Sequence, residues 1–321
     1  MCKVFFLVGP TATGKTAVAQ KIAEERGWDI LSADSMLIYK GMNIGTAKPS
    51  TAEQSKVNYF GIDLAEPSEV FSVRDYYLHA LSALEIVKKK KKNLIVTGGT
   101  GLYIKAVLQG LSESAPPDYG AREIWTELLK TKGLQALQNK LQTINPRIYE
   151  ALSDKENPRR LIRALEQAES DCGIVKRSWK SAEQPEIYGI NFPRKTLIRR
   201  ITERVEHMFD SGLLEEVGDL CNAGLESAPT AIQGIGYSEA LAVLQNKMDI
   251  ETAKEQIVLR TKRLAKRQMT WFRNQANVNW FDAEPEDTIN TICREISERW
   301  DKSGGIFIDD LIAIHKPESC E

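Results

Sequence analysis

The chain has 321 residues, of which 42% are hydrophobic and 27% charged, and its formal net charge is −1. This composition is typical of a globular protein of one large or two medium domains, and the charge neither requires nor excludes a polyanionic partner. Without an apolar run of about 18 residues or a leader pattern, we expect no membrane span and no export. Five scattered cysteines without a C-x-x-C pair favour reduced thiols in a cytoplasmic protein.

The first third of the chain alternates predicted strands and helices. Short apolar runs predict strands at Lys3–Val8, Asp29–Ser32, Phe60–Leu64 and Asn93–Thr97. Apolar residues at helical spacing predict helices at Thr16–Arg26 and Tyr76–Val87. Alternation of this kind is typical of the α/β fold class, with a parallel sheet that carries helices on both faces.

After Leu111 the pattern changes. A Ser/Pro-rich linker at Ser112–Asp118 precedes a block that reads as helical to about Gln167, and a second polar linker lies at Ser178–Glu186. We therefore predict an all-helical subdomain, residues 112–184, inserted into a core made of residues 1–111 and 185–300.

The core resumes with a predicted strand at Ile187–Phe192. Long amphipathic helical stretches follow at Lys195–Ala223 and Ile250–Asn274, which supply C-terminal helices. Residues 301–321 carry few packing signals beyond "IFIDDLIAI", so we expect a loosely attached tail without an assigned role.

Residues Gly9–Thr16, "GPTATGKT", match the phosphate-loop pattern G-x-x-x-x-G-K-[ST] and lie between a predicted strand and a predicted helix. Backbone N–H groups of such a loop and the N-terminus of its helix bind phosphate oxygens. Lys15 adds a positive charge, and Thr16 offers a hydroxyl to a Mg²⁺ ion that bridges two phosphates. Phosphate binding is thus predicted for Gly9, Pro10, Thr11, Ala12, Thr13, Gly14, Lys15 and Thr16.

The loop does not identify the molecule that carries the phosphate. One interpretation is a small-molecule kinase that uses ATP, and another is a transferase whose donor loses pyrophosphate. Both fit, because a leaving diphosphate and the β,γ-phosphates of ATP carry nearly the same charge. A third, a nucleotide-driven RNA-binding switch, lacks a recognisable guanine-specificity motif. Asp34 and Ser35 end a strand beside the loop, where ligands gather in open α/β sheets, although an isolated Asp–Ser pair is more often a cap or a turn.

Six segments occur in an order that resembles one known family. They are "GPTATGKT", "DSMLIYKGMNIGTAKP", "GGTGLY", "RRLIRALE", "QGIGYSE" and "RLAKRQMTWFR". In these segments the chain is similar to the bacterial tRNA dimethylallyltransferases, also called tRNA isopentenyltransferases, from Val4 to about Asp282. It departs from their pattern at Thr13 (usually Ser), Asn43 (usually Asp) and Ser238 (commonly Lys or Arg).

The resemblance implies a prenyltransferase. Members move the dimethylallyl group from dimethylallyl diphosphate to N6 of the adenosine just 3′ of the anticodon, in tRNAs that read codons beginning with U, and release pyrophosphate. The expected partners are then dimethylallyl diphosphate and tRNA, the expected cofactor is Mg²⁺, and a monomer is the default.

The resemblance also assigns catalytic roles. Asp34 matches the family's general base, while Lys15 and Thr16 act on the diphosphate. Arg200 and Arg204 stand four residues apart on one helix face, and by the family pattern at least one of them reaches the diphosphate. A salt-bridged face with Glu203 and Glu206 is nearly as good an interpretation for the other arginine.

Positions that match the family's RNA contacts complete the prediction. An adenosine inside the anticodon loop must turn outward to reach Asp34. The expected tRNA-binding residues are Asp34, Ser35, Met36, Leu37, Thr100, Arg122, Arg159, Arg160, Leu161, Ile162, Arg163, Gln233, Gly234, Ile235, Gly236, Tyr237 and Ser238. The basic helix at Ile250–Asn274 adds positive charge, and its Trp271 is expected to be a core residue.

Overall fold

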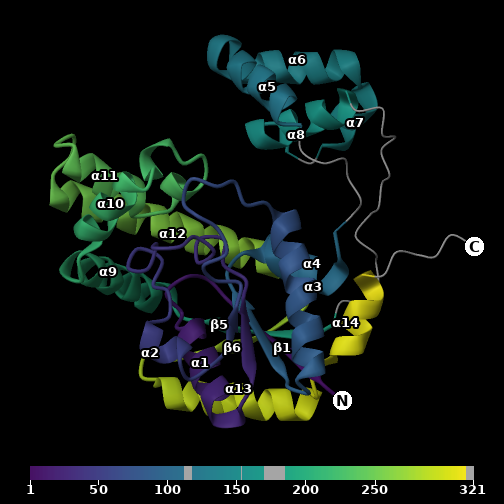
Figure 1. Cartoon of the computed structure of the whole chain (residues 1–321), viewed down its shortest axis with the longest axis vertical. Coiled ribbons are helices and arrows are strands. Elements are labelled where there is room, and N and C mark those ends of the chain that lie inside the picture. Colours follow the sequence, from purple (N-terminus) through teal and green to yellow (C-terminus); the bar gives the residue numbers. More distant parts are fainter. Residues whose placement is uncertain (112–117, 153, 170–184, 316–321) are drawn as a thin grey trace, which may run out of the picture. The chain divides into compact units, whose positions relative to one another are not determined.

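The computed structural model describes residues 1–111, 118–152, 154–169 and 185–315. It divides the chain into two compact units, one made of Met1–Gly110 with Ala182–Glu321 and one made of Leu111–Ser181. Figure 1 traces both units along the sequence. Nearly all of the two predicted linkers, Ser112–Asp118 and Ser178–Glu186, lies outside the described residues.

Unit 1 is built on a parallel sheet. Its strands β1 to β6 follow the order β3-β2-β4-β1-β5-β6, and the neighbours along this path are parallel. Their bounds are β1 Lys3–Val8, β2 Asp29–Ser32, β3 Tyr59–Phe60, β4 Leu94–Gly98, β5 Ile187–Asn191 and β6 Val278–Asp282. The predicted α/β class is confirmed. The third strand is shorter and earlier than the predicted Phe60–Leu64, and β6 was not predicted.

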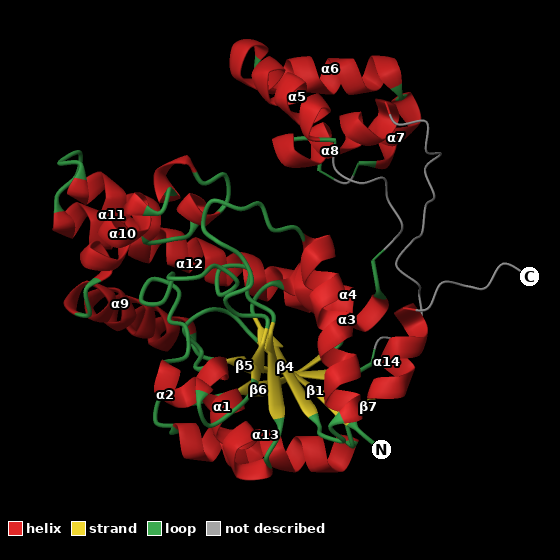
Figure 2. Cartoon of the chain, in the orientation of Figure 1, coloured by secondary structure: helices red, strands yellow, loops and turns green. Residues whose placement is uncertain are grey.

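Helices cover both faces of this sheet (Figure 2). Phe5 and Leu7 of β1 pack on the side of α1 (Lys15–Arg26) and α13 (Ile289–Ser303). Alternate β1 residues pack on the other side, with the helices α3 (Val73–Lys89), α4 (Gly101–Gln109) and α14 (Ile308–His315). Because side chains alternate along a strand, a continuously apolar β1 is what a sheet buried on both faces requires.

A third hydrophobic core joins the remaining helices of unit 1. The predicted helical stretch Lys195–Ala223 is two helices, since Gly212 has φ 96° and the chain turns there between α9 and α10. The predicted Ile250–Asn274 helix is present. The bounds are α2 Thr51–Gln54, α9 Arg194–Asp210, α10 Leu213–Asn222, α11 Tyr237–Leu244 and α12 Ile250–Gln275, with short 3₁₀ turns at Leu225–Ser227 and Ala231–Gln233.

The expectation of a loose tail was wrong for residues 306–315. Strand β7 (Ile306–Phe307) pairs antiparallel with the start of β1. Ile308 is 0% exposed and Leu311 1%, within the core that covers one face of the sheet. Apolar residues at positions 308, 311 and 312 form the inward stripe of a short helix, which the sequence pattern contained. Residues 316–321 lie outside the described part.

Unit 2 is helical in its described residues, as predicted for the inserted block. Its helices are α5 (Tyr119–Lys132), α6 (Leu134–Ile144), α7 (Pro146–Ala151) and α8 (Pro158–Glu169). They enclose a small core of Trp125, Leu137, Leu141, Ile148, Leu161, Ala164 and Leu165.

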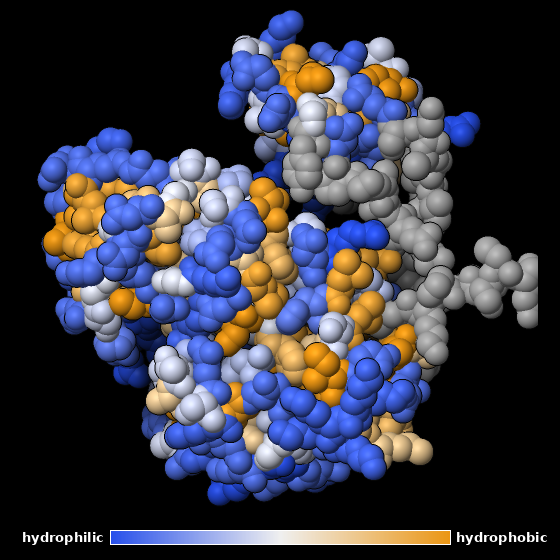
Figure 3. Space-filling view, in the orientation of Figure 1, coloured by the Kyte–Doolittle hydropathy of each residue, from blue (hydrophilic) through white to orange (hydrophobic). Residues whose placement is uncertain are grey.

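The surface and the thiols add two findings. Within the described residues, no helix is long and apolar enough to cross a membrane. Hydrophilic residues cover most of the face that Figure 3 shows, with hydrophobic ones between them. Cys2, Cys221 and Cys293 are free thiols, while Cys172 and Cys320 lie outside the described residues.

Candidate active site

The predicted phosphate loop follows β1 and leads into α1. Its backbone turns inward through positive φ angles at Gly9 (150°), Ala12 (66°) and Gly14 (81°). A Cβ atom on Gly9 would lie 2.6 Å from the carbonyl oxygen of Ile190, so this close passage of β5 excludes any side chain. Inside the loop, Lys15 Nζ donates to the carbonyl oxygen of Pro10 at 3.3 Å. The loop therefore has the tight backbone turns of the predicted motif, and phosphate binding stays a prediction.

Both candidate arginines of α9 lie against this loop. Arg200 donates from Nε to the carbonyl oxygen of Ala12 at 2.8 Å, and its guanidinium stacks 4.7 Å from the centre of the Phe192 ring. Arg204 donates from Nη1 to Thr11 Oγ1 at 3.2 Å. The sequence left one of the two arginines open to a salt-bridged helix face, and the structure places both beside the loop.

The acidic neighbours on α9 have other partners. Glu203 pairs with Arg199 at 3.7 Å, and Glu206 pairs with Lys254 of α12 at 2.6 Å. In the ion pairs that the described residues form, these two carboxylates therefore do not pair with Arg200 or Arg204.

Burial disfavours the charged forms of Lys15, Arg200 and Arg204. It lowers the pKa of Lys15 to about 8, an effect that the nearby Asp34 carboxylate opposes and Arg204 reinforces. Burial also lowers the pKa of Arg200 and of Arg204, and Asp34 partly offsets it for Arg204. A group of desolvated cations is an environment that binding of an anion stabilises.

Asp34 and Thr100 meet at the carboxyl edge of the sheet. Asp34 follows β2, and its Oδ1 accepts a hydrogen bond from the Met36 N–H at 2.9 Å. Thr100 follows β4, and its Oγ1 accepts from the Ser35 N–H at 3.1 Å. A Cβ atom on Gly98 would lie 2.2 Å from the carbonyl oxygen of Ala33, so the glycine allows these two strand ends to approach.

Gln268 of α12 is a site residue that the sequence analysis missed. Its Oε1 accepts a hydrogen bond from the Thr11 N–H at 2.8 Å, and a Cβ atom on Gly99 would lie 2.3 Å from its Nε2. Gln268 occurs at helical spacing from the buried residues Ala265 and Phe272, and an amide on such a stripe was the available signal. The neighbouring Trp271 packs against the core, as expected.

In unit 1 the structure brings two predicted RNA-binding segments together. A Cβ atom on Gly234 would lie 3.3 Å from Met36 Sδ, so the segment Gln233–Ser238 packs beside the residues that follow Asp34. Gln233 is exposed and Ile235 is half-buried. The expectation is corrected for Leu37 and Tyr237, which are 6% and 0% exposed and leave almost no side-chain surface for RNA.

Unit 2 holds the remaining predicted RNA contacts. Arg159 and Arg160 are exposed and Ile162 is half-buried. Leu161 is 0% exposed in the helical core, so its side chain is a packing residue. The arginines Arg122 and Arg163 pair with the buried carboxylate of Glu166, Arg163 Nη1 at 2.8 Å from Oε2. These two arginines therefore also stabilise unit 2, a role that the sequence did not indicate.

Comparison with known proteins decides between the open interpretations. A family model described as IPP transferase matches residues 37–275. The chain belongs to the IPP transferase family. It is 38% identical over 297 residues to the tRNA dimethylallyltransferase of Natranaerobius thermophilus, and the match covers 90% of this chain and 89% of that protein. The family relationship favours a prenyltransferase over a kinase or a nucleotide-driven switch.

Solved structures of IPP transferase relatives agree with the fold. The full-length tRNA isopentenylpyrophosphate transferase of Bacillus halodurans is 34% identical, has a TM-score of 0.67, and the match covers 95% of this chain and 98% of that one. A eukaryotic dimethylallyltransferase acting on tRNA has a TM-score of 0.70 at 20% identity, covering 100% of this chain and 82% of that one, which supports the fold.

The expected Mg²⁺ ion stays a prediction, and it would take most of its ligands from the substrate and from water. Among the described residues, no group of three or more His, Cys, Asp or Glu side chains could hold a metal. Thr16 is half-buried in the first turn of α1, directly after Lys15. Mg²⁺ takes oxygen ligands, keeps several waters, and often binds through few protein groups together with substrate phosphates. The residues present fit such a metal, and Thr16 is the side chain that would hold it.

Proposed function

We propose that this IPP transferase transfers the dimethylallyl group of dimethylallyl diphosphate to N6 of an adenosine in tRNA and releases pyrophosphate. The target would be the adenosine just 3′ of the anticodon in tRNAs that read codons beginning with U. The names of the relatives support the reaction class. The observation that carries the proposal is the convergence of Lys15, Arg200 and Arg204 on one preformed loop, beside the Asp34 carboxylate.

The loop and its cations would act on the leaving group. As the bond between the allylic carbon and the diphosphate oxygen breaks, negative charge grows on the departing pyrophosphate. The loop and the three side chains would stabilise that charge, because the fold holds these cations beside the loop. Mg²⁺ at Thr16, when bound, would neutralise part of the same charge.

Asp34 would act on the nucleophile. The N6 lone pair of adenine is delocalised into the ring, so the amine attacks poorly unless a base removes its proton as the new C–N bond forms. The Met36 N–H holds Asp34 through Oδ1, and Oδ2 would take that proton. Assistance of this kind is typically worth about 10²–10⁴-fold. Thr100, whose Oγ1 accepts from the Ser35 N–H, would contact the same nucleotide.

Positive charge would hold the RNA. The exposed arginines and lysines of α12 include Arg263, Lys266, Arg267 and Arg273, and unit 2 presents Arg159 and Arg160. Contacts with phosphates position the tRNA, while extrusion of the adenosine costs roughly a few kcal/mol. This distribution explains why a nearly neutral chain has a polyanionic partner.

One assay tests the proposal against both alternatives. Labelled dimethylallyl diphosphate is incubated with the protein and unmodified tRNA, and the RNA is digested to nucleosides. The proposal predicts label on N6 of one adenosine. ATP hydrolysis stimulated by a small hydroxyl compound, without label in RNA, would indicate a kinase. RNA binding controlled by a nucleotide, again without label, would indicate a switch.

A further inference from the structure

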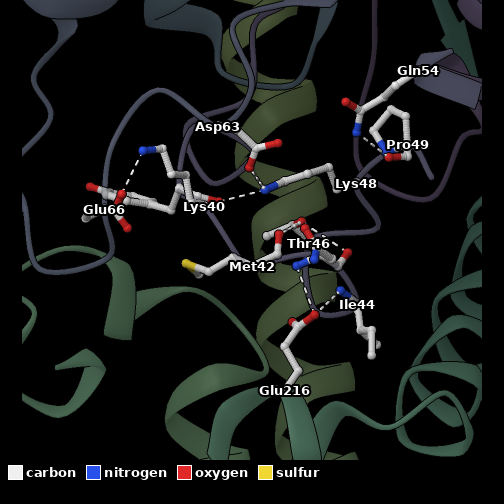
Figure 4. A network of polar contacts seen from close by, with 12 residues as sticks. Lys40, Met42, Ile44, Thr46, Lys48, Pro49, Gln54, Asp63, Glu66 and Glu216 are labelled. Atoms are coloured by element: carbon white, nitrogen blue, oxygen red, sulfur yellow. Dashed lines mark hydrogen bonds and ion pairs between the residues drawn. The ribbon is translucent and has the colours of Figure 1, made fainter. Parts of the chain in front are cut away.

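A carboxylate from α10 holds the loop that follows the Asp34 segment (Figure 4). Glu216 Oε2 accepts hydrogen bonds from the Asn43 N–H at 3.0 Å and the Ile44 N–H at 2.7 Å. Its Oε1 accepts from the Gly45 N–H at 3.2 Å and from the Tyr237 hydroxyl at 2.7 Å. Three consecutive backbone donors and one phenol therefore converge on a single side chain.

Each of these partners is a donor, which only an ionised carboxylate satisfies in full. Burial, with the negative charge of Glu216 beside it, raises the pKa of Tyr237, so the phenol keeps its proton and donates. Consecutive N–H groups that converge in this way form an anion-binding nest. Here the protein fills the nest with its own carboxylate.

The fit between this loop and Tyr237 is close. A Cβ atom on Gly45 would lie 2.6 Å from the Tyr237 ring, so any side chain at position 45 would displace one or the other. The far end of the loop is fixed as well, because the buried Lys48 donates to the Tyr39 carbonyl oxygen at 2.7 Å and to Asp63 at 2.6 Å. Figure 4 shows both ends of this network.

We infer that Glu216 is a positioning residue that joins the loop Asn43–Gly45 to the segment Gln233–Ser238 as one preformed surface for tRNA. The inference rests on the proposed function. It follows from the placement of Tyr237, which lies inside that segment and touches the loop. Gly234 of the same segment also packs beside Met36, which follows Asp34 in the sequence. Glu216 thus organises residues of the predicted RNA-binding segment and of the loop packed against it.

The variant Glu216→Gln keeps the size of the side chain but removes its charge and one of its acceptor oxygens. A glutamine has one oxygen, which can accept about two of the four hydrogen bonds, and its NH₂ group would face donors. Glu216→Ala removes all four. Glu215→Gln is a matched control, because Glu215 lies in the same first turn of α10, is exposed, and loses the same charge.

The test measures tRNA and pyrophosphate affinity, steady-state kinetics, amide exchange and Tm for these variants. We expect Glu216→Gln to raise the Kd and KM for tRNA by about tenfold, in line with the cost of a small misplacement in a binding site. The Kd for pyrophosphate and the KM for the donor should stay within about twofold, as for a change outside the donor site. Hydrogen exchange of the Asn43, Ile44 and Gly45 amides should become faster. These effects should be larger in Glu216→Ala than in Glu216→Gln, and Glu215→Gln should behave like the wild type.

Two results would overturn the inference while leaving the proposed function intact. One is a wild type that transfers the prenyl group and a Glu216→Gln variant with unchanged tRNA affinity. The other is a parallel loss of tRNA affinity, donor affinity and Tm, which would mark Glu216 as a general stabiliser. A wild type that binds tRNA without transferring label would instead contradict the proposed function, and tRNA affinity of the variants would still test Glu216.

Discussion

Arg204 reaches across from α9 to donate to the hydroxyl of Thr11 at 3.2 Å, one helical turn beyond the contact of Arg200 with Ala12. The two arginines lie more than 180 positions away from the loop in sequence. Their approach adds two guanidinium groups from α9 to the predicted phosphate loop and its Lys15.

Replacing either arginine by glutamine should weaken the diphosphate site. Each loses a charge-assisted hydrogen bond, worth about 1.5–3 kcal/mol, and so we expect the Kd for pyrophosphate to rise about 10- to 100-fold. Arg199→Gln is the control, because Arg199 is exposed and pairs with Glu203. Calorimetric titration with pyrophosphate measures the effect. Equal affinities for Arg204→Gln and Arg199→Gln would remove Arg204 from the site.

Lys15 should make diphosphate binding sensitive to alkaline pH. Its pKa in the free protein is lowered to about 8, chiefly by burial, so the ammonium is lost as the pH rises through that value. Above about pH 8 this loss of positive charge should lower pyrophosphate affinity, against the opposite effect of the growing negative charge on pyrophosphate itself. Lys15→Met should bind weakly at every pH and lack this loss, so a wild type with the same pH profile as Lys15→Met would contradict the assignment.

The same lowered pKa predicts how stability depends on pH. Between about pH 8 and the ordinary value of 10.5, the unfolded chain holds a proton at position 15 that the folded chain has lost. The free energy of unfolding of the ligand-free protein should therefore gain from this group as the pH rises through that range. Urea unfolding of the wild type and Lys15→Met checks the sign, and a contribution that falls with pH would be inconsistent with a buried Lys15.

Gln268 should support the donor site through the Thr11 N–H. Gln268→Met keeps the size but removes the acceptor, at a cost of about 0.5–1.5 kcal/mol, so the KM for the donor should rise about threefold to tenfold. Gln268→Glu keeps an acceptor but adds a negative charge near the diphosphate, and the KM should rise further. Thr270→Ala, on the exposed side of α12, is the control. A Gln268→Glu variant with tighter donor binding would argue against this placement.

Arg159 and Arg160 should set the salt dependence of tRNA binding. Each phosphate contact that is lost removes about 0.7–0.9 from the slope of log affinity against log salt. The pair Arg159→Gln and Arg160→Gln should bind tRNA more weakly and with a flatter slope, measured by filter binding over a salt series. Lys132→Gln, exposed on α5 of the same unit, serves for comparison. An unchanged slope in the arginine variants would mean that they do not touch phosphates.

The local parts of the fold and of the site were readable from the sequence. The phosphate loop is one contiguous motif, and the apolar run of β1 already indicated a strand buried on both faces. Asp34 was placed correctly at a strand end, because chain order in an α/β sheet brings such ends to one edge. The short stripe at positions 308–312 lies within "IFIDDLIAI", but its packing against the sheet was not predicted.

The partners of those local elements were beyond a sequence pattern. Gln268 meets Thr11 across 257 positions, and Glu216 meets Asn43 across 173. Neither Gln268 nor Glu216 lies in a motif or at a spacing that indicates contact with a distant backbone N–H group. The periodicity of α12 and α10 predicted helices with buried stripes, but which loop each stripe meets depends on how the whole unit packs.

Asp34→Asn in a single-turnover assay tests the central claim most directly. The amide oxygen can still accept from the Met36 N–H, so the loop keeps its shape, while the group that takes the N6 proton is lost. With pyrophosphate and tRNA affinities measured alongside, we predict tRNA affinity close to that of the wild type and a transfer rate to tRNA that is lower by about 10²–10⁴-fold. A variant that binds both ligands and transfers the dimethylallyl group at the wild-type rate would contradict the account.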